Sequence, residues 1–528
     1  MTSTLVERAD LTGAAGPADH DLVFVGAGAS TAYVLLALLA GLRTEAPGPP
    51  RRIAVVERAP DPFSGVAYGS RAARTSLLIT PLRDFLPEDE RALFVPWLTQ
   101  NKDWVFDEFL ASAGPLAGRW WARHRAEIQR GAFDSLYLPR YVFGTYLMRR
   151  TRSAIASATA AGVATVDLVQ DAVRSIEQDG DSYALHGTDG VVHGRHVVLA
   201  TGSAPVRPRL PDHAETPPAV LVDDPFDEMG TALERIRHGL ERAARRRAPH
   251  VVLIGANAGT MDMLFQINDL RVAALRNTTF TILSPRGELP ERFDRSGPAR
   301  PFTAARLLAL EDSPDVPAAA LYRAALDDIG RGRAAGLTVA DTLPPISQAL
   351  GRVVRRLSPD QAVEFAGRWG IEIGRYQRRA GGEYCDVVEE LTAQDRLSIV
   401  AGSFTDVVPG EGTVTVRYAD DGVLRELDRP ADVVVNCGGP GKLLTDADAS
   451  LPARLIERGL CRATPFGGGI AVDASLAAAP RLYVMGPLLA GNLVKGAPVW
   501  HMEHCGRISS FGWALGTDLA RTLTTNEG

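Results

Sequence analysis

The chain has 528 residues, more than a single hydrophobic core supports, so two or three domains are expected. Its hydrophobic fraction of 45% and charged fraction of 23% are those of an ordinary globular protein, and its formal net charge is only −6. This balance argues against a nucleic-acid partner, which requires a basic face on the protein.

Local composition excludes several other classes of protein. The densest basic run, ARRR at 244–247, precedes an apolar strand and is predicted to be a solvated helix end. The apolar run 33–42 is too short to span a bilayer, for which about 20 residues are needed. Residues 1–19 lack the apolar core of a signal peptide and are predicted to be a disordered tail.

The cysteines indicate a reducing compartment. None of the four forms a CxxC pair, which argues against a zinc finger and against dithiol reductase chemistry. Together with the absence of a recognisable signal peptide, this predicts a cytoplasmic protein. The four cysteines are Cys385, Cys437, Cys461 and Cys505.

Residues 20–41 have the pattern of a dinucleotide-binding unit, with an apolar strand, a glycine turn and an apolar helix. Glycines allow close backbone approach at the turn, and a pyrophosphate would bind at the helix N-terminus. A second apolar strand, 52–56, ends in an acidic residue expected to bind a ribose hydroxyl. The third small position of the motif holds a threonine instead of glycine. The candidate contacts of this unit are Gly26, Gly28, Ser30, Thr31 and Glu57.

Two loops and a set of short strands continue this unit. Residues 58–69 are rich in proline and glycine and are predicted to form an irregular loop over the site. Residues 77–98 carry three prolines between apolar groups, which fits either a loop that covers a bound cofactor or ordinary packing. From 173 the sequence alternates as in a hairpin or three-stranded meander, whose last strand ends in Thr201 and Gly202. These small residues suit close approach to a nucleotide.

A second unit with the same pattern begins at residue 249. Asn257 replaces the middle glycine of its turn; asparagine tolerates a positive φ, yet its side chain takes up room that a pyrophosphate would use. The following strand, 280–283, leads to Arg286, which lies where a 2′-phosphate would bind and favours NADP over NAD. An ordinary surface arginine is the alternative. The candidate contacts here are Gly255, Asn257, Gly259, Thr260 and Arg286.

The rest of the chain combines a helical region with further strands. Residues 296–395 are predicted to be helical, and their arginines at 375, 378 and 379 form either a solvated face or a contact to an anion. The strand 432–436 ends in glycines, which suggests that the chain has re-entered its first domain. A last strand, 481–485, ends at Gly486, and a helix is expected to follow.

These motifs, in this order, resemble the bacterial FAD-NAD(P)-binding proteins related to the two-dinucleotide-domain flavin monooxygenases. The sequence is also similar, more distantly, to the amine N-hydroxylating monooxygenases. The resemblance covers most of the chain. The motifs are GAGAS at 26–30, GVAYG at 65–69, PRYVFGTYL at 139–147, VVLATGSAP at 197–205, DDPFD at 223–227, GANAGTMD at 255–262, GRYQRRA at 374–380 and MGPLLAGNL at 485–493.

The resemblance implies an α/β fold with two Rossmann-like dinucleotide-binding domains, the second inserted in the first, plus a helical insertion. Residues 20–225 and 396–528 would form the FAD-binding domain, and 226–395 the NAD(P)-binding domain with the helical insertion. FAD would bind in the first domain and NADPH in the second. The final strand and the following helix would lie beside the flavin. The resemblance adds Arg140, Gly486, Pro487 and Leu488 to the candidate cofactor contacts.

The function implied is a monooxygenase in which NADPH reduces FAD, O2 forms a C4a-hydroperoxyflavin, and a small molecule takes the distal oxygen. An amine nitrogen is the favoured acceptor. Because the cofactor carries the chemistry, no nucleophile triad or carboxylate pair is required. Asn492 and His501, near the expected flavin edge, are the candidate catalytic residues, and a structural role is the preferred alternative for each.

Other interpretations remain at this stage. The FxGxxxHxxxW/Y signature is absent between the two glycine motifs, which lowers the weight of Baeyer–Villiger and classical flavin-containing monooxygenases. His501, Glu503 and His504 invite a metal interpretation, but no further ligand has supporting spacing, so no metal is expected. One rival function is an oxidase or dehydrogenase whose flavin is reduced by its own substrate, which Asn257 supports. The other is a flavin-binding redox partner.

Overall fold

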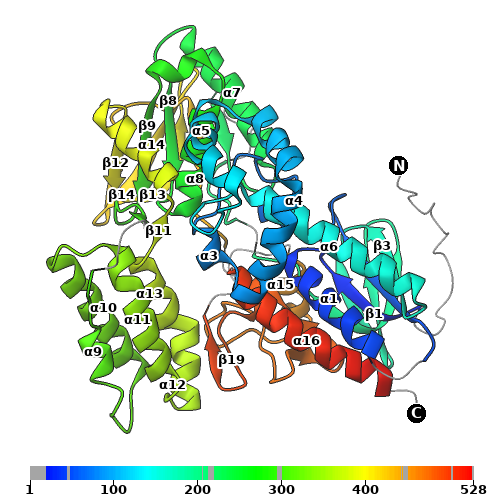
Figure 1. The fold of residues 1–528 in the computed structure, drawn as a ribbon. Coiled ribbons are helices and arrows are strands. Elements are labelled where there is room, and N and C mark those ends of the chain that lie inside the picture. Colours follow the sequence, from blue (N-terminus) through cyan, green and yellow to red (C-terminus); the bar gives the residue numbers. More distant parts are fainter. Residues whose placement is uncertain are drawn as a thin grey trace.

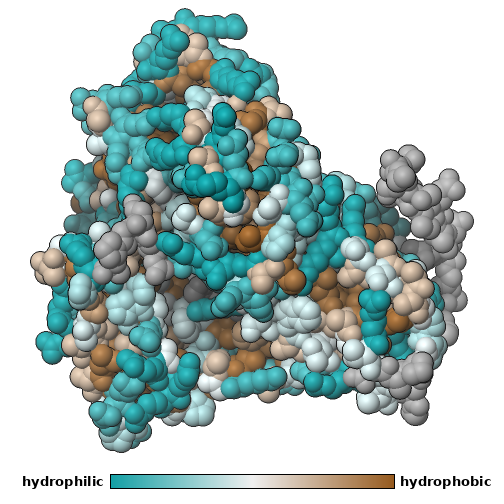
Figure 2. All heavy atoms as spheres, viewed as in Figure 1, coloured by the Kyte–Doolittle hydropathy of each residue, from teal (hydrophilic) through white to brown (hydrophobic). Residues whose placement is uncertain are grey.

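The computed structural model describes residues 19–44, 48–204, 206–211, 219–293, 300–441, 443, 450–500 and 504–525. All of the predicted tail except Asp19 lies outside these residues. In the described part of the chain, no helix is long and apolar enough to cross a membrane. On the face shown in Figure 2, hydrophilic residues cover most of the surface and hydrophobic residues lie between them in small groups.

The first unit is a mostly parallel sheet that begins with the predicted strand, turn and helix. Its order is β17-β18-β6-β1-β2-β3, and β6 is extended by the antiparallel meander β4-β5-β6. The central strands are buried on both sides, as apolar parallel strands must be. The strands are β1 (His20–Val25), β2 (Arg51–Glu57), β3 (Ala164–Gln170), β4 (Ser175–Asp179), β5 (Ser182–His186), β6 (Val191–Leu199), β17 (Ala477–Ala479) and β18 (Leu482–Val484).

Three long helices pack on this unit. The turn helix α1 (Ala29–Thr44) lies against the C-terminal helix α16 (Cys505–Thr525), and Figure 1 shows the two side by side. The third, α6 (Arg140–Ala160), packs on α1 and on β3. The C-terminal segment therefore returns to the first unit, where β18 pairs in parallel with β6.

The second unit is a parallel sheet inserted in sequence between β6 and β18. Its order is β12-β9-β8-β16-β7, and all of its pairs are parallel. Its strands are β7 (Val220–Val222), β8 (His250–Ile254), β9 (Thr279–Ser284), β12 (Leu397–Ala401) and β16 (Val433–Asn436), with helices α7 (Met229–Ala244), α8 (Ala258–Asp269), η2 (Ala273–Asn277) and α14 (Gly382–Ala393). An antiparallel sheet of β13 (Ser403–Pro409), β14 (Val414–Asp420) and β15 (Val423–Glu426) precedes β16.

The strand at 433–436 does not mark a return to the first domain, contrary to the expectation from its glycine ending. It lies between β8 and β7 in the second sheet, so the chain has not re-entered the first unit at this point. The same holds for β12, which pairs with β9. The glycines that follow β16 misled the prediction because each unit has its own strand that ends in glycines beside its turn. We propose that the second unit runs from β7 through β16.

A helical insertion interrupts the second unit between β10 (Glu291–Arg292) and β11 (Arg379–Ala380), two short strands that pair at its base. It has a separate hydrophobic core and lies at the lower left of Figure 1. Its helices are α9 (Ala305–Leu308), α10 (Ala318–Ala334), α11 (Val339–Val354), α12 (Pro359–Glu364), the π-helical turn η3 (Phe365–Trp369) and α13 (Gly370–Tyr376).

The insertion packs on the part of the first unit that follows β18. That part contains η4 (Gly486–Leu489) and the hairpin β19 (Asn492–Val494) and β20 (Ala497–Val499). Phe365 of η3 makes an edge-to-face contact with Trp500, with ring centroids 5.4 Å apart. The helix α15 (Leu451–Glu457) precedes this region.

A helical excursion from the first unit reaches over to the second. It consists of α2 (Gly65–Tyr68), α3 (Leu82–Phe85), α4 (Glu88–Ser112) and α5 (Pro115–Arg130). Pro87 precedes the first turn of α4, where its missing N–H costs nothing, so the expected loop at 77–98 becomes helical beyond it. The amide groups of Gly114 and Leu116 donate to the carboxylate of Asp269, at the end of α8, at 3.0 and 2.7 Å. The two units are thereby joined away from the linker, which is the chain segment between β6 and β7.

Candidate functional site

The first glycine turn has the geometry that a dinucleotide pyrophosphate requires. Gly26 has φ +93°, and a Cβ there would lie 2.5 Å from the carbonyl oxygen of Ala200, just after β6. The Gly26 amide donates to the carbonyl of Val56 at 2.8 Å. Gly28 puts no side chain in front of α1, whose first-turn N–H groups have no partner within the helix. These amides and the helix dipole suit a phosphate group.

Thr31 and Glu57 hold the turn in place. The Thr31 hydroxyl is buried and donates to the carbonyl of Gly26 at 2.6 Å, so its side chain closes the turn. The Glu57 carboxylate accepts from the amides of Ala27, at 2.7 Å, and Ala59, at 2.9 Å. Carboxylate oxygens accept more than one hydrogen bond, so the expected contact to a ribose hydroxyl stays a proposal that this geometry permits.

The segment after β18 completes this site. The Met485 amide donates to the carbonyl of Leu199 at 2.9 Å, and Gly486 follows with φ +78°. A Cβ on Gly486 would lie 2.8 Å from Oγ of Ser30, so η4, which contains Pro487 and Leu488, begins against the first turn of α1. The tertiary structure thus brings together the candidate FAD contacts Gly26, Gly28, Ser30, Thr31, Glu57, Thr201, Gly202 and Gly486.

The loop after β2 lies over the turn, as predicted for residues 58–69. Phe63 is buried, has φ +76° and donates its amide to the carbonyl of Ala27 at 2.5 Å. Gly65 has φ +64°, and a Cβ there would lie 3.2 Å from Cα of Gly28. This close backbone approach explains the glycines at both positions.

The second turn repeats the glycine and threonine contacts of the first. Gly255 has φ +109°, donates its amide to the carbonyl of Leu283 at 2.8 Å, and accepts the hydroxyl of Thr260 at 3.0 Å. A Cβ on Gly255 would lie 2.7 Å from the carbonyl oxygen of Cys437, just after β16. Cys437 is therefore the equivalent of Ala200. Aligning GAGAST with GANAGT would have revealed from sequence that Thr31 and Thr260 are equivalent, a signal that motif matching overlooked.

Asn257 behaves differently from the prediction. Its φ is −135°, so the tolerance of asparagine for positive φ plays no part. Its side chain caps α8: Oδ1 accepts from the Thr260 amide at 3.1 Å, and Nδ2 donates to the carbonyl of Cys437 at 2.7 Å. One amide at the start of α8 is therefore occupied by the protein itself.

Arginines from two separate segments gather at this second turn. The Arg378 guanidinium donates to the carbonyl of Ala256 at 3.0 Å, and burial together with the charges of Arg286 and Arg375 lowers the pKa of Arg378. Arg286 lies over the ring of Tyr376, 4.8 Å from its centroid. Glu372 pairs with Arg375, so three arginines face one carboxylate here, and the remaining positive charge beside the turn suits a phosphate monoester. Arg379, grouped with these arginines in the sequence, instead lies over another ring, that of Phe293.

Two of the remaining candidates are engaged elsewhere. Arg140 donates to the carbonyl of Leu77 at 2.9 Å and pairs with Asp262 of α8 at 3.2 Å. Burial works to lower the pKa of Arg140, but Asp262 together with Tyr384 and Tyr68 raises it. Asn492 is 6% exposed and makes all three of its side-chain hydrogen bonds to backbone groups of 470, 472 and 489. This geometry favours the structural alternative for Asn492.

The candidate His501 and its neighbour Glu503 lie outside the described residues. His504 is described: its Nε2 lies 3.0 Å from the backbone oxygen of Asp84, and its Nδ1 accepts from the Gly506 amide at 3.2 Å. In the described part of the chain, no group of three or more metal-ligating side chains comes together.

All four cysteines are buried and none forms a disulfide. Burial raises the pKa of Cys385 to about 11 and those of Cys461 and Cys505 to about 12, and it also raises the pKa of Cys437. Because the thiolate is the reactive form, these thiols are inert at neutral pH.

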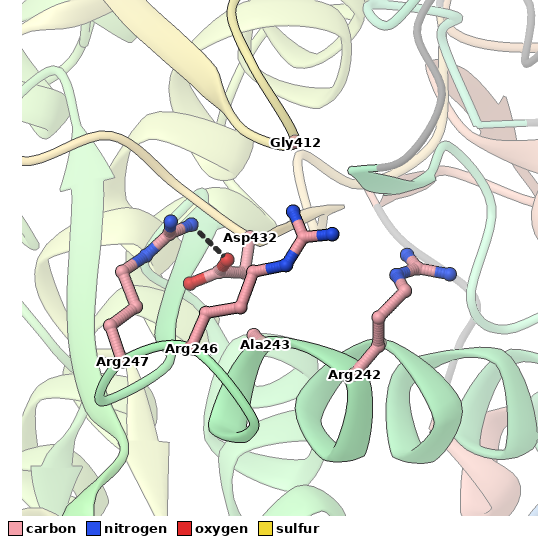
Figure 3. A pocket seen from close by; sticks show the side chains of 7 residues that line it. Arg242, Ala243, Arg246, Arg247, Gly412 and Asp432 are labelled. Carbon is pink, nitrogen blue, oxygen red and sulfur yellow. Dashed lines mark hydrogen bonds and ion pairs between the residues drawn. The ribbon is translucent and has the colours of Figure 1, made fainter.

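The pocket in Figure 3 lies apart from both turns. Figure 3 shows Arg242 and Arg246 beside it at the end of α7, and Arg247 ion-paired with the buried Asp432. Asp432 directly precedes β16, so the pocket lies at the amino edge of the second sheet, whereas ligands of parallel α/β sheets bind at the carboxyl edge. The basic run at 244–247 is thus a helix end, as predicted, and Arg247 anchors it.

Comparison with known proteins agrees with this geometry. Residues 23–204 match the model of the FAD-NAD(P)-binding family. The uncharacterized proteins Rv3403c of Mycobacterium tuberculosis (strain ATCC 25618 / H37Rv) and Mb3437c of Mycobacterium bovis are each 30% identical over 519 residues, which is 96% of both chains. The chain belongs to the same family as these mycobacterial proteins, and its residues 23–204 match an FAD-NAD(P)-binding domain.

Solved structures with a similar fold include three enzymes that oxygenate amines. The ornithine N-hydroxylase KtzI of Kutzneria sp. 744 has 16% identity and a TM-score of 0.53, covering 97% of this chain and 100% of its own. The ornithine hydroxylase PvdA of Pseudomonas aeruginosa is 13% identical and has a TM-score of 0.54; the match covers 96% of this chain and 99% of PvdA. The cadaverine monooxygenase DfoA of Erwinia amylovora is 11% identical and has a TM-score of 0.55; the match covers 96% of this chain and 95% of DfoA.

These likenesses establish the fold of a flavoprotein with two dinucleotide-binding domains. The family match over residues 23–204 and the duplicated turns indicate a protein whose cofactors are FAD and a nicotinamide dinucleotide. The first turn fits FAD, since its glycines leave the first-turn amides of α1 uncovered. The second turn, with its arginines, fits a phosphorylated nicotinamide dinucleotide.

Proposed function

We propose that the protein is an FAD-dependent, NADPH-using monooxygenase that oxygenates the nitrogen of a small amine. The observation that carries the proposal is the pairing of two equivalent dinucleotide turns with arginines gathered at the second. The fold likeness to ornithine and cadaverine hydroxylases over nearly the whole chain supports an amine as the acceptor. The inert cysteines speak against a dithiol route for the electrons.

The residues of this chain would bind and orient the cofactors. FAD supplies the hydride acceptor and the site at which O2 is activated, so the protein needs no nucleophile of its own. The amides at the start of α1 would hold the FAD pyrophosphate, and Glu57 a ribose hydroxyl. At the second turn, Arg286, Arg375 and Arg378 would bind the 2′-phosphate of NADPH. The helical insertion, which packs on the segment after β18, would help to exclude water.

The test is the flavin spectrum of the purified protein. We expect anaerobic NADPH to bleach the flavin absorbance without any amine present. On admission of air, with ornithine, lysine and cadaverine supplied separately, one amine should gain a single oxygen atom, measured by mass spectrometry. NADPH oxidation that yields only hydrogen peroxide with every amine tested would contradict amine oxygenation.

A second candidate has one observation in its favour. The Asn257 side chain occupies the Thr260 amide, which weakens the phosphate-binding capacity of α8. An oxidase or dehydrogenase whose flavin is reduced by its own substrate needs no nicotinamide site. It predicts that NADPH leaves the flavin oxidised under anaerobic conditions while an amine substrate bleaches it. A redox carrier would instead show NADPH oxidation only when a partner protein is added.

A further inference from the structure

Residues 206–209, in the linker between the two units, are held against the carboxyl end of β16. Val206 forms an antiparallel bridge with Pro440, in the glycine-rich loop after that strand. The carboxylate of Asp223 accepts from the Arg209 amide at 3.0 Å and from the side-chain amide of Asn436, also at 3.0 Å. Because Asn436 is fully buried at the end of β16, the backbone of Arg209 is held in a defined position.

The Arg209 side chain lies directly beside the second turn. Its Nε is 2.9 Å from the place where a Cβ on Gly438 would lie, and its Cζ is 3.5 Å away. Gly438 in turn adjoins the turn glycine, since a Cβ on Gly255 would lie 3.3 Å from Cα of Gly438. In the described part of the chain, the buried Nε of Arg209 has no hydrogen-bond partner.

Comparison of the two units shows what this arginine replaces. Cys437 corresponds to Ala200, so Gly438 corresponds to Thr201, and Gly439 (φ +84°) to Gly202 (φ +82°). In the second unit the Arg209 guanidinium occupies the place that a side chain on Gly438 would need. The first unit has a small hydroxyl at this position, whereas the second has a cation.

The second unit also has fewer amide donors for a phosphate. Asn257 occupies the Thr260 amide, whereas its counterpart in the first unit, Gly28, has no side chain that could cap Thr31. A pyrophosphate at the second turn therefore lacks one donor and needs another source of positive charge. We propose that Arg209 binds the pyrophosphate of the nicotinamide dinucleotide, in place of the helix amide that Asn257 occupies.

This proposal extends the cofactor assignment and does not depend on amine oxygenation. Dinucleotide binding can be measured on the FAD-loaded full-length protein with NADP+ and NAD+, without amine or electron transfer. Failure of the proposed function would therefore leave this result intact. NAD+ lacks the 2′-phosphate, so the two ligands separate the pyrophosphate contact from the contact assigned to Arg286.

The test is calorimetric titration of two variants. For Arg209→Gln we expect the affinities for NADP+, NAD+ and ADP-ribose to fall by the same factor, roughly tenfold or more, since a charge-assisted contact to a shared phosphate is lost. For Arg286→Gln we expect a loss for NADP+ only. The affinity of Arg209→Gln should also depend less steeply on salt concentration.

The matched control is Arg152→Gln, on the exposed side of α6, which should leave all affinities unchanged. NAD+ binding by Arg209→Gln at wild-type affinity would overturn the proposal, as would a loss confined to NADP+. If Arg209→Gln loses its flavin or unfolds at a lower temperature, Arg209→Lys decides, because it keeps the charge. Near wild-type affinity of Arg209→Lys for NAD+ supports the contact, whereas a loss as large as in the Gln variant overturns it.

Discussion

At the scale of single residues, a buried histidine gives the fold a pH dependence. His196 lies in β6 with 1% of its surface exposed, and neither ring nitrogen has a hydrogen-bond partner among the described residues. Burial, with the charges of Arg481 and Arg195, lowers the pKa of His196 from 6.5 to about 4. The folded state therefore binds fewer protons than the unfolded chain between these values. The free energy of unfolding is therefore unaffected by His196 above pH 6.5, and His196 lowers it progressively as the pH falls from 6.5 toward 4.

The prediction is that His196→Leu flattens this dependence. Between pH 7 and pH 5, His196 should cost the wild type about 2 kcal/mol of unfolding free energy, which the leucine variant should not lose. Urea unfolding at both pH values measures the difference. His250 and His504, whose pKa values are also lowered by burial, keep a residual slope in both proteins. Equal pH dependence in wild type and variant would show that His196 is not responsible.

At the scale of elements, each glycine turn depends on close contact with the end of a neighbouring strand. In the first unit, Gly26 combines φ +93° with a Cβ position 2.5 Å from the backbone of Ala200. For Gly26→Ala we expect β6 and the start of α1 to move apart. Because the phosphate-binding amides move with the helix, the amount of flavin bound per protein should fall at least roughly tenfold. The ratio of flavin to protein absorbance measures this.

The control for this change is Gly118→Ala. Gly118 lies inside α5, and no atom is found within 4 Å of its Cβ position. Alanine there should keep the flavin and stabilise the helix by about 0.5–1 kcal/mol. A Gly26→Ala protein that retains a full complement of flavin would contradict the role assigned to the turn.

At the scale of the whole molecule, a buried polar cluster joins the two units. Asp262 of α8 is fully buried, pairs with Arg140 at 3.2 Å, and accepts hydrogen bonds from Ser76 at 3.2 Å and Tyr384 at 2.9 Å. Ser76 and Arg140 belong to the first unit, whereas Asp262 and Tyr384 belong to the second. The cluster therefore fixes the orientation of one dinucleotide turn relative to the other.

Asp262→Asn tests this junction. It leaves the Arg140 charge buried without its carboxylate, which should cost about 3–5 kcal/mol in urea unfolding. The two units should then unfold in separate transitions. Glu426→Gln, which breaks the solvent-exposed pair of Arg417 and Glu426, should cost at most about 1 kcal/mol. A single transition with an equally small loss in Asp262→Asn would indicate that the cluster does not couple the units.

The sequence by itself determined the local units. A glycine turn after an apolar strand requires a positive φ or the absence of a side chain at the turn residues themselves. Gly26, Gly28 and Gly255 could therefore be recognised without knowing their spatial neighbours. The same holds for the meander at 173–200, whose pairs form between adjacent segments. The insertion of the second unit in the first was implied by the resemblance to the two-dinucleotide-domain flavin monooxygenases.

Only the tertiary structure decided what depends on segments far apart in the chain. The pairing of β16 with β8 and β7 moved 433–436 into the second unit, because strand partners are chosen by packing and not by the strand's own ending. The side-chain amide of Asn257 found its partner at the carbonyl of Cys437, and the linker brought Arg209 to Gly438. These contacts join residues that nothing in the local sequence connects, so they exist only once the chain has folded.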